Sequence, residues 1–166
     1  MTIIGIDNGL SGGVAVLDYA RRFVSLKSFS VMPTVKKNKK NAIDIGKLNG
    51  LLDVQDVTDE KYAFVELAHA MPGQGVTSMF NFGMGYGINL ALLHAHGFKV
   101  EIVSPQKWQK AQFGPDVADT KLTSVNVANL KFGLNLRKAE HGISDAINIA
   151  LYGLDKILDE SNATNP

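Results

Sequence analysis

Three acidic residues and a histidine, far apart in the chain, are of the types that hold divalent metal ions. Asp7 and Glu66 each follow a short apolar run, and His141 and Asp145 stand four residues apart in EHGISDAINIALYG. Mg2+ prefers oxygen ligands, and several carboxylates around two such ions can activate a water molecule for phosphodiester hydrolysis. A neutral histidine can bind a metal or assist a proton transfer. These four residues are therefore the candidate site for metal-dependent hydrolysis.

Each of the four residues also has an ordinary structural interpretation. Asp7 precedes the turn signal LSGG, so it could belong to that turn or accompany a phosphate-binding loop. A glutamate at the end of a strand is most often solvated, and an aspartate early in a helix is favoured there by the helix dipole. A histidine near the start of a helix most often lies on the surface. Spacing alone leaves these alternatives open.

The elements expected around the four residues could bring them together. If the strands that end near Asp7 and Glu66 are parallel neighbours, the two carboxylates meet at one edge of the sheet. Asp145 and His141 share one face of a helix because they are four residues apart, and Asn148 follows one turn later as a supporting residue. The order of elements predicts an α/β fold, a mixed sheet with helices on its faces. Strands are expected over residues 2–6, 13–18, 22–30, 62–67 and 98–103, and helices over 45–53, 76–96, 119–131 and 140–159, with a further helix starting at Ser104-Pro105.

Length and composition limit the class of protein. The 166 residues, 45% hydrophobic and 20% charged, suit one globular domain, expected over residues 1–160 with a flexible tail at 161–166. The chain has no cysteine, and it has no apolar run of about 18 residues that would cross a membrane. The first residues enter a strand without the basic start of a signal peptide, so a cytoplasmic protein is expected. The net charge is only +1, so any basic surface must be local.

Four segments together resemble the RuvC-like Holliday junction resolvases, especially their small phage-type members. In chain order they are IGIDNGLSGGVAVLD, FVELAHAMPGQGVTSMFNFGMGYG, VSPQKWQKAQFG and EHGISDAINIALYG. The resemblance implies an RNase H-like fold, in which a mixed five-stranded sheet with its first three strands antiparallel is flanked by helices. It also implies a metal-dependent endonuclease of DNA recombination and repair that resolves four-way junctions by paired symmetric nicks, with other branched DNA as a further candidate substrate.

The resemblance also implies roles for the site residues. Asp7, Glu66 and Asp145 correspond to the acidic ligands of two Mg2+ ions, which Mn2+ can replace, and His141 corresponds to a fourth site residue that binds metal or transfers a proton. Many members carry an acidic residue or histidine three positions before the last aspartate, where this chain has Gly142. Glu140 is a reserve candidate. The family is homodimeric, so a homodimer in the cytoplasm of a bacterial or phage-infected cell is expected.

Contacts with DNA are expected from basic residues and from the loop that follows Glu66. Lysines on phosphates supply much of the affinity for nucleic acid. The loop at 69–75 could enter the crossover of a junction, with His69 or Met71 as a wedge between bases. Lys36–Lys40 could equally be a solvated loop, and Trp108 is expected to be a core anchor rather than a base-stacking residue. The candidates for DNA contact are Lys36, Lys37, Lys39, Lys40, His69, Met71, Gln74, Lys107, Lys110 and Lys121.

Two other functions stay open. A non-catalytic protein on the same fold would bind branched DNA without cutting it. An actin-like or sugar-kinase-type phosphotransferase shares the first motif, which reads strand, aspartate, glycine turn and strand. Such enzymes need two domains of this kind in a much longer chain, so no nucleotide cofactor is expected.

Overall fold

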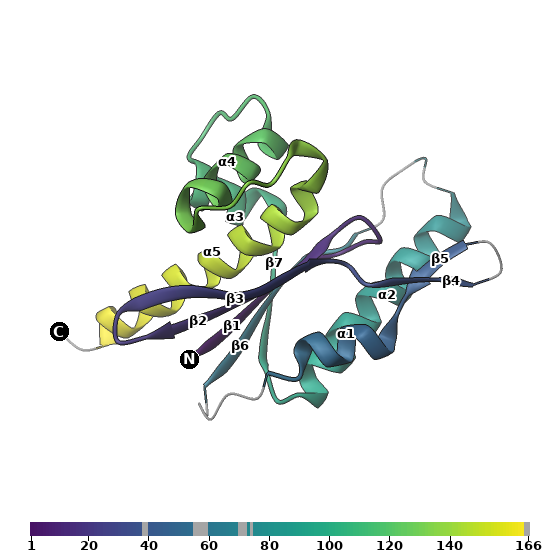
Figure 1. Cartoon of the computed structure of the whole chain (residues 1–166), viewed down its shortest axis with the longest axis horizontal. Helices are drawn as coiled ribbons and strands as arrows, with labels where there is room; N and C mark the ends of the chain where they lie inside the picture. The colour runs from purple at the N-terminus through teal and green to yellow at the C-terminus, as the bar shows by residue number, and fades with distance from the viewer. Residues whose placement is uncertain (38–39, 55–59, 70–72, 74, 165–166) are drawn as a thin grey trace.

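A central five-stranded sheet organises the protein (Figure 1). The computed structural model describes residues 1–37, 40–54, 60–69, 73 and 75–164. In spatial order the strands are β3 (Phe23–Val31), β2 (Gly13–Ala20), β1 (Thr2–Asp7), β6 (Lys61–Glu66) and β7 (Lys99–Val103). Strands β1, β2 and β3 pair antiparallel with one another, whereas β6 and β7 run parallel to β1. The predicted mixed sheet is therefore confirmed.

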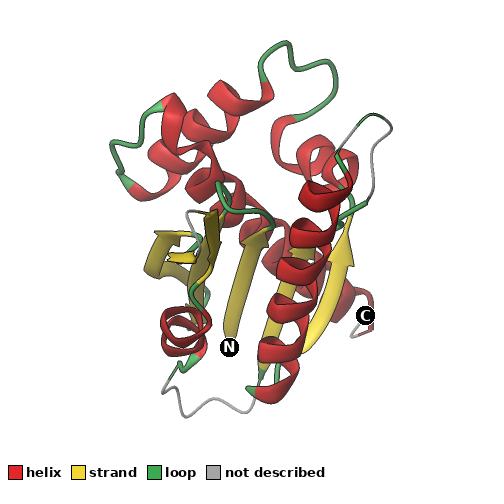
Figure 2. Cartoon of the chain, turned by 90° about the vertical axis from the view of Figure 1, so that its right-hand side faces the viewer, coloured by secondary structure: helices red, strands yellow, loops and turns green. Residues whose placement is uncertain are grey.

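Helices cover both faces of this sheet, as Figures 1 and 2 show. Side chains of a strand alternate between its two faces, so the sheet supports one core on each side. Ile4 packs in the cluster with α1 and α2, and Ile3 packs in the cluster with α3, α4 and α5. The helices are α1 (Ile45–Leu52), α2 (Val76–Ala95), α3 (Pro105–Phe113), α4 (Thr120–Phe132) and α5 (His141–Thr164). Within the described residues no helix is long and apolar enough to cross a membrane.

The helix starts follow the local signals in the sequence. The Asp119 carboxylate accepts a hydrogen bond from the backbone N–H of Leu122 at 3.1 Å, which caps α4. Pro105 is the first residue of α3, where its missing N–H costs nothing because that group has no partner in the helix. These local rules place α3 and α4 within a residue of the predicted starts.

Two segments differ from the prediction. The ends of the basic segment Lys36–Lys40, expected as a loop, lie instead in two paired strands: Lys36 and Lys37 end β4 (Thr34–Lys37), and Lys40 begins β5 (Lys40–Ile43). Ile43 is buried and lies against Gly85 of α2, so an apolar anchor at its base fixes the hairpin. The last helix continues to Thr164, so residues 161–164, expected in a tail, are helical.

Candidate metal centre

Asp7 and Glu66 end neighbouring parallel strands. The register pairs Ile6 of β1 with Val65 of β6, so the residue after each lies at the same carboxyl edge of the sheet. Both side chains project toward the face covered by α5, because Ile3 and Phe64, an even number of residues earlier, pack on that face. The structure thus brings the two carboxylates together, as the strand pattern predicted.

Glycines let the first turn of α5 lie directly on the turn that follows Asp7. A Cβ added at Gly13 would collide with the backbone carbonyl of Gly142, and one added at Gly142 would collide with that of Ser11. This contact carries Asp145 over the sheet edge, close enough that its charge raises the pKa of Asp7. It also explains why position 142 carries no acidic residue or histidine, since any side chain there would strike the turn.

Burial raises the pKa of all three carboxyl groups, and repulsion from neighbouring carboxylates adds to the shift at Asp7 and Asp145. For Asp7, burial is the largest cause, followed by the charges of Glu66 and Asp145. Burial also raises the pKa of Glu66, and it raises that of Asp145 to about 6. The charge of Lys121 opposes the shift at both Asp7 and Asp145. A divalent cation among these groups would remove their repulsion, so the cluster has the oxygen ligands and the charge that Mg2+ requires.

The Asp7 and Glu66 carboxyl groups interact directly with each other. A hydrogen bond between the two side chains raises the pKa of Asp7 and lowers that of Glu66. In the described part of the chain, no group of three or more acidic, histidine or cysteine side chains converges in the tight geometry of a preformed metal site. Binding an ion would therefore require Asp7 to be ionised and the carboxylates to close around the cation.

Trp108 of α3, the helix that follows the neighbouring strand β7, holds Glu66 in place. Its indole Nε1 donates a hydrogen bond to Glu66 Oε1 at 3.0 Å, and the side chain is fully buried. Its ring packs edge-on against Phe113 with centroids 5.4 Å apart. Trp108 was predicted as a core anchor, and its burial confirms this, but its contact with Glu66 was missed. The pairing of Glu66 with Val103, just before α3, is the tertiary fact that brings the tryptophan there.

Asn8 is a second residue that the sequence analysis missed. Its side-chain amide donates to the backbone carbonyl of Glu66, and its Oδ1 accepts a hydrogen bond from Asn89 Nδ2 at 2.8 Å. Asn89 is fully buried in α2, and Asn8 is nearly so. These two bonds tie the ends of β1 and β6 to each other and to α2.

Asn148 supports the site through Ser124. Its Nδ2 donates to both the backbone oxygen and the hydroxyl of Ser124, each at 3.0 Å. A hydrogen bond from the Ser124 side chain in turn lowers the pKa of Asp145. Asn148 therefore holds Ser124 from a buried position between α4 and α5, and its supporting role at a metal site stays a prediction.

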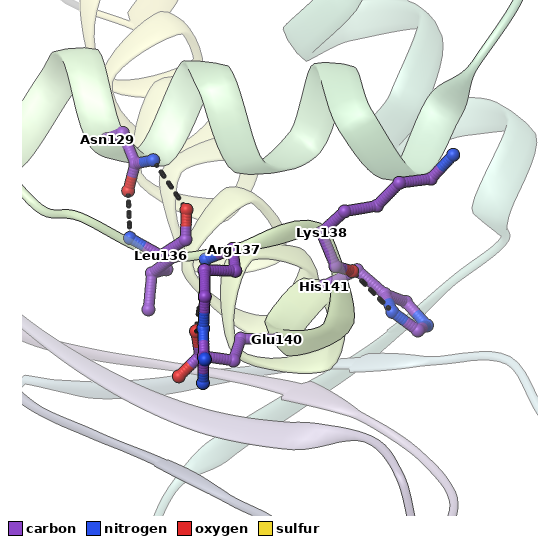
Figure 3. Close-up of polar contacts among 6 residues, drawn as sticks. All are labelled: Asn129, Leu136, Arg137, Lys138, Glu140 and His141. Atoms are coloured by element: carbon purple, nitrogen blue, oxygen red, sulfur yellow. Dashed lines mark hydrogen bonds and ion pairs between the residues drawn. The ribbon is translucent and has the colours of Figure 1, made fainter.

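His141 and Glu140 point in different directions from the start of α5 (Figure 3). The charge of His141 lowers the pKa of Asp145, so the two side chains are neighbours. His141 Nδ1 lies 3.2 Å from the backbone oxygen of Lys138, and an N–H there would leave Nε2 free for a metal or a proton. Glu140 instead accepts hydrogen bonds from the backbone N–H and Nε of Arg137, both at 3.0 Å. The reserve role of Glu140 is therefore wrong, because its carboxylate is held away from the cluster.

The segment that leads into α5 is itself fixed by α4. Asn129 Nδ2 donates to the backbone oxygen of Leu136 at 2.9 Å, and its Oδ1 accepts from the N–H of Leu136 at 2.8 Å (Figure 3). The 3-10 turn η1 (Lys138–Glu140) follows directly and leads to His141. The position of His141 thus depends on contacts made by α4.

Two of the DNA-contact candidates lie near the carboxylates. Lys121 is exposed in the first turn of α4, and His69 is exposed after β6, where its charge lowers the pKa of Glu66. Lys107 and Lys110 are exposed on α3, and Lys36 is exposed on β4. The remaining candidates lie outside what the structure describes, either whole or in their side chains: Lys37, Lys39, Lys40, Met71 and Gln74.

The fold is similar to that of solved Holliday junction resolvases. Thermus thermophilus RuvC in complex with a Holliday junction substrate is 21% identical, with a TM-score of 0.67 over 92% of each chain. A second structure of Thermus thermophilus RuvC gives 19% identity and a TM-score of 0.64, again over 92% of each chain. The yeast mitochondrial Holliday junction resolvase gives 13% identity and a TM-score of 0.54, covering 90% of this chain and 76% of the yeast chain.

Sequence comparison adds no closer relative. A scan of protein-family models found no match, and a search of curated proteins found none either. At identities this low the likeness concerns the fold. This chain therefore has the RNase H-like fold of the RuvC resolvases, as its four sequence segments indicated.

Proposed function

We propose that this protein is a metal-dependent endonuclease that cuts four-way DNA junctions. One observation carries the proposal: carboxylates from β1, β6 and α5 meet at the carboxyl edge of a sheet that has the RuvC fold. One of the similar structures is a RuvC bound to a Holliday junction substrate. The raised pKa values of the three groups support metal binding, because perturbed carboxylates gathered in a cluster are typical of functional sites.

Asp7, Glu66 and Asp145 would hold two Mg2+ or Mn2+ ions, with His141 beside Asp145. Bound ions would activate a water molecule and stabilise the leaving oxygen of the cut phosphodiester. Trp108 fixes one oxygen of Glu66 and so leaves the other oriented for a ligand role. His141 can accept or donate a proton at Nε2. Lys121, close to Asp7 and Asp145 and exposed to solvent, would attract the phosphate that is cut.

Two copies of the chain would act on one junction. A four-way junction has two strands to cut at symmetric positions, and a two-fold dimer places two identical sites in matching orientations. We therefore propose a homodimer as the active form.

A cleavage assay with conservative variants tests the proposal. Asp7→Asn, Glu66→Gln and Asp145→Asn each remove a charged ligand with little change of volume, so each should abolish nicking of a labelled junction in Mg2+ or Mn2+. Binding, measured by gel shift without catalytic metal, should persist. Glu140→Gln is the matched control, because that carboxylate bonds Arg137 and faces away from the site.

The outcomes separate the open alternatives. Full cleavage by any of the three variants would show that its carboxylate is no metal ligand. Binding by the unaltered protein with no product in either metal would instead identify a non-catalytic protein that recognises branched DNA.

A further inference from the structure

A groove of about 750 Å3 lies on the α2 side of the sheet edge that carries Asp7. Its walls come from the turn between β1 and β2, from the N-terminal half of α2, and from β5. Strands β4 and β5 lie beside α2 (Figure 1). Its volume is within the range of small-ligand sites, about 300–1,000 Å3. The residues that give it chemical character are Leu10, Asn41, Ile43, Met79, Asn81 and Phe82.

Asn8 joins this groove to the carboxylates. It lines the groove, and its amide donates to the backbone carbonyl of Glu66. Because successive side chains of a strand point to opposite faces, Asp7 faces α5 while Asn8 faces α2. The groove and the carboxylates therefore lie on either side of one sheet edge, one residue apart in the chain. A DNA strand crossing this edge with a phosphate at Asp7 would bring a neighbouring base to the groove.

The lining suits a neutral, flat ligand with polar edges. None of the described residues that line the groove carries a charge, so the groove supplies no cation that would pair with a phosphate. Phe82 presents an aromatic ring, on which any base can stack. The side-chain amides of Asn41 and Asn81 have no hydrogen-bond partner within the described residues, so both can donate to and accept from a ligand. A nucleobase matches each of these features.

We propose that this groove binds an unstacked nucleobase of the strand being cut, with Phe82 as the stacking surface and Asn41 and Asn81 contacting its edge. The inference rests on the proposed function, since it places the base beside the cut phosphate. Unstacking costs least where pairing is already interrupted, and a branch point is such a place. The groove would then give cleavage a preference for particular bases at one position.

Fluorescence tests base binding separately from cleavage. Junctions would carry a fluorescent purine analogue, whose emission rises on unstacking, at each position around the branch point. The Asp7→Asn variant should raise the emission at one position only. Adding Phe82→Leu should remove that rise, whereas adding Phe80→Leu should not, because Phe80 is an exposed ring of α2 outside the groove. Melting curves would verify that all variants fold.

Cleavage of a panel of core sequences tests the reading of the base. Asn81→Ala should reduce the preference for the favoured base about tenfold or more. Without the amide of Asn81, the favoured base no longer makes a hydrogen bond that the other bases lack. Phe82→Leu should slow all sequences alike, since stacking is tolerant of base identity. Phe80→Leu should leave both rate and preference unchanged.

Three results would overturn the proposal. Unchanged emission at every position, with binding intact, would show that no base enters the groove even if cleavage proceeds. An altered oligomeric state of Phe82→Leu without loss of the emission rise would show that a second copy occupies it. An equal base preference in Asn81→Ala and in the unaltered protein would show that Asn81 does not determine which base is favoured. If no junction is cut in Mg2+ or Mn2+ but the emission rise is present, the proposed function fails and the groove still binds a base.

Discussion

Replacing Trp108 by phenylalanine separates the support of Glu66 from the packing of the core. Trp108→Phe keeps an aromatic ring against Phe113 but removes the N–H that lies 3.0 Å from Glu66 Oε1. A hydrogen bond to a charged group contributes about 1.5–3 kcal/mol, and loss of a residue that orients a metal ligand typically costs about 10- to 100-fold in metal affinity or activity. We therefore expect junction cleavage to need about 10- to 100-fold more Mg2+, or to slow by that factor.

A second readout concerns the acidity of Glu66. The hydrogen bond from Trp108 lowers the pKa of Glu66 against the effect of burial. Its removal should raise that pKa, so the acidic limb of the pH–rate profile should move to higher pH. A defect of packing alone would not move this limb. Titration calorimetry with Mn2+ on the unreacted protein gives the metal affinity without any cleavage step.

Phe113→Leu is the matched control for this variant. Phe113 packs on the same tryptophan ring, and the described contacts of Glu66 do not include it. Both variants should lose some stability, and less than the ~3–5 kcal/mol that full truncation of a large aromatic residue costs. If Trp108→Phe and Phe113→Leu show the same Mg2+ requirement and the same pH profile, the indole N–H does not support the metal site and the reasoning fails.

Two further predictions concern stability. The pKa of Asp145 is about 6 in the folded protein, against 3.8 in the unfolded chain. The contribution of this group to the free energy of unfolding is therefore full below pH ~3.8, and it falls by ~3 kcal/mol as the pH rises through 6. Stabilisation by Mg2+ in thermal melts should therefore be larger above pH 6 than below it, and a pH-independent metal effect, or one that persists in Asp145→Asn, would contradict this. Gly5→Ala should destabilise the protein by ~3 kcal/mol or prevent folding, because a Cβ there meets the backbone of Ala146 and Ala150. Gly87→Ala is the control, because nothing lies within 4 Å of a Cβ there, and it should leave the free energy of unfolding unchanged or raise it by up to ~1 kcal/mol. Denaturant titration measures both variants. An equal loss of stability in both would show that the close approach of α5 does not explain the effect of Gly5→Ala.

The parts of the site that the sequence predicted correctly depend on patterns within single segments. Apolar runs ending at Asp7 and Glu66 identified two strand ends, and the four-residue spacing of His141 and Asp145 put both on one helix face. The hairpin strands β4 and β5 were missed because they are short and mostly polar, and because their anchor, Ile43, is buried through tertiary contacts that include α2. The roles of the four residues as metal ligands, and those of the lysines as DNA contacts, stay predictions.

The sequence by itself determined which residue types were available for chemistry and which kind of element would carry each. Periodicity and capping act over a few neighbouring residues, so they can be read from one segment at a time. Only the tertiary structure decided that Trp108 reaches Glu66, that Asn8 lines a groove on the other face, and that Gly142 lies on the turn after Asp7. Each of these contacts joins segments far apart in the chain. They depend on strand register and on how closely two backbones approach, and no local sequence pattern encodes either property.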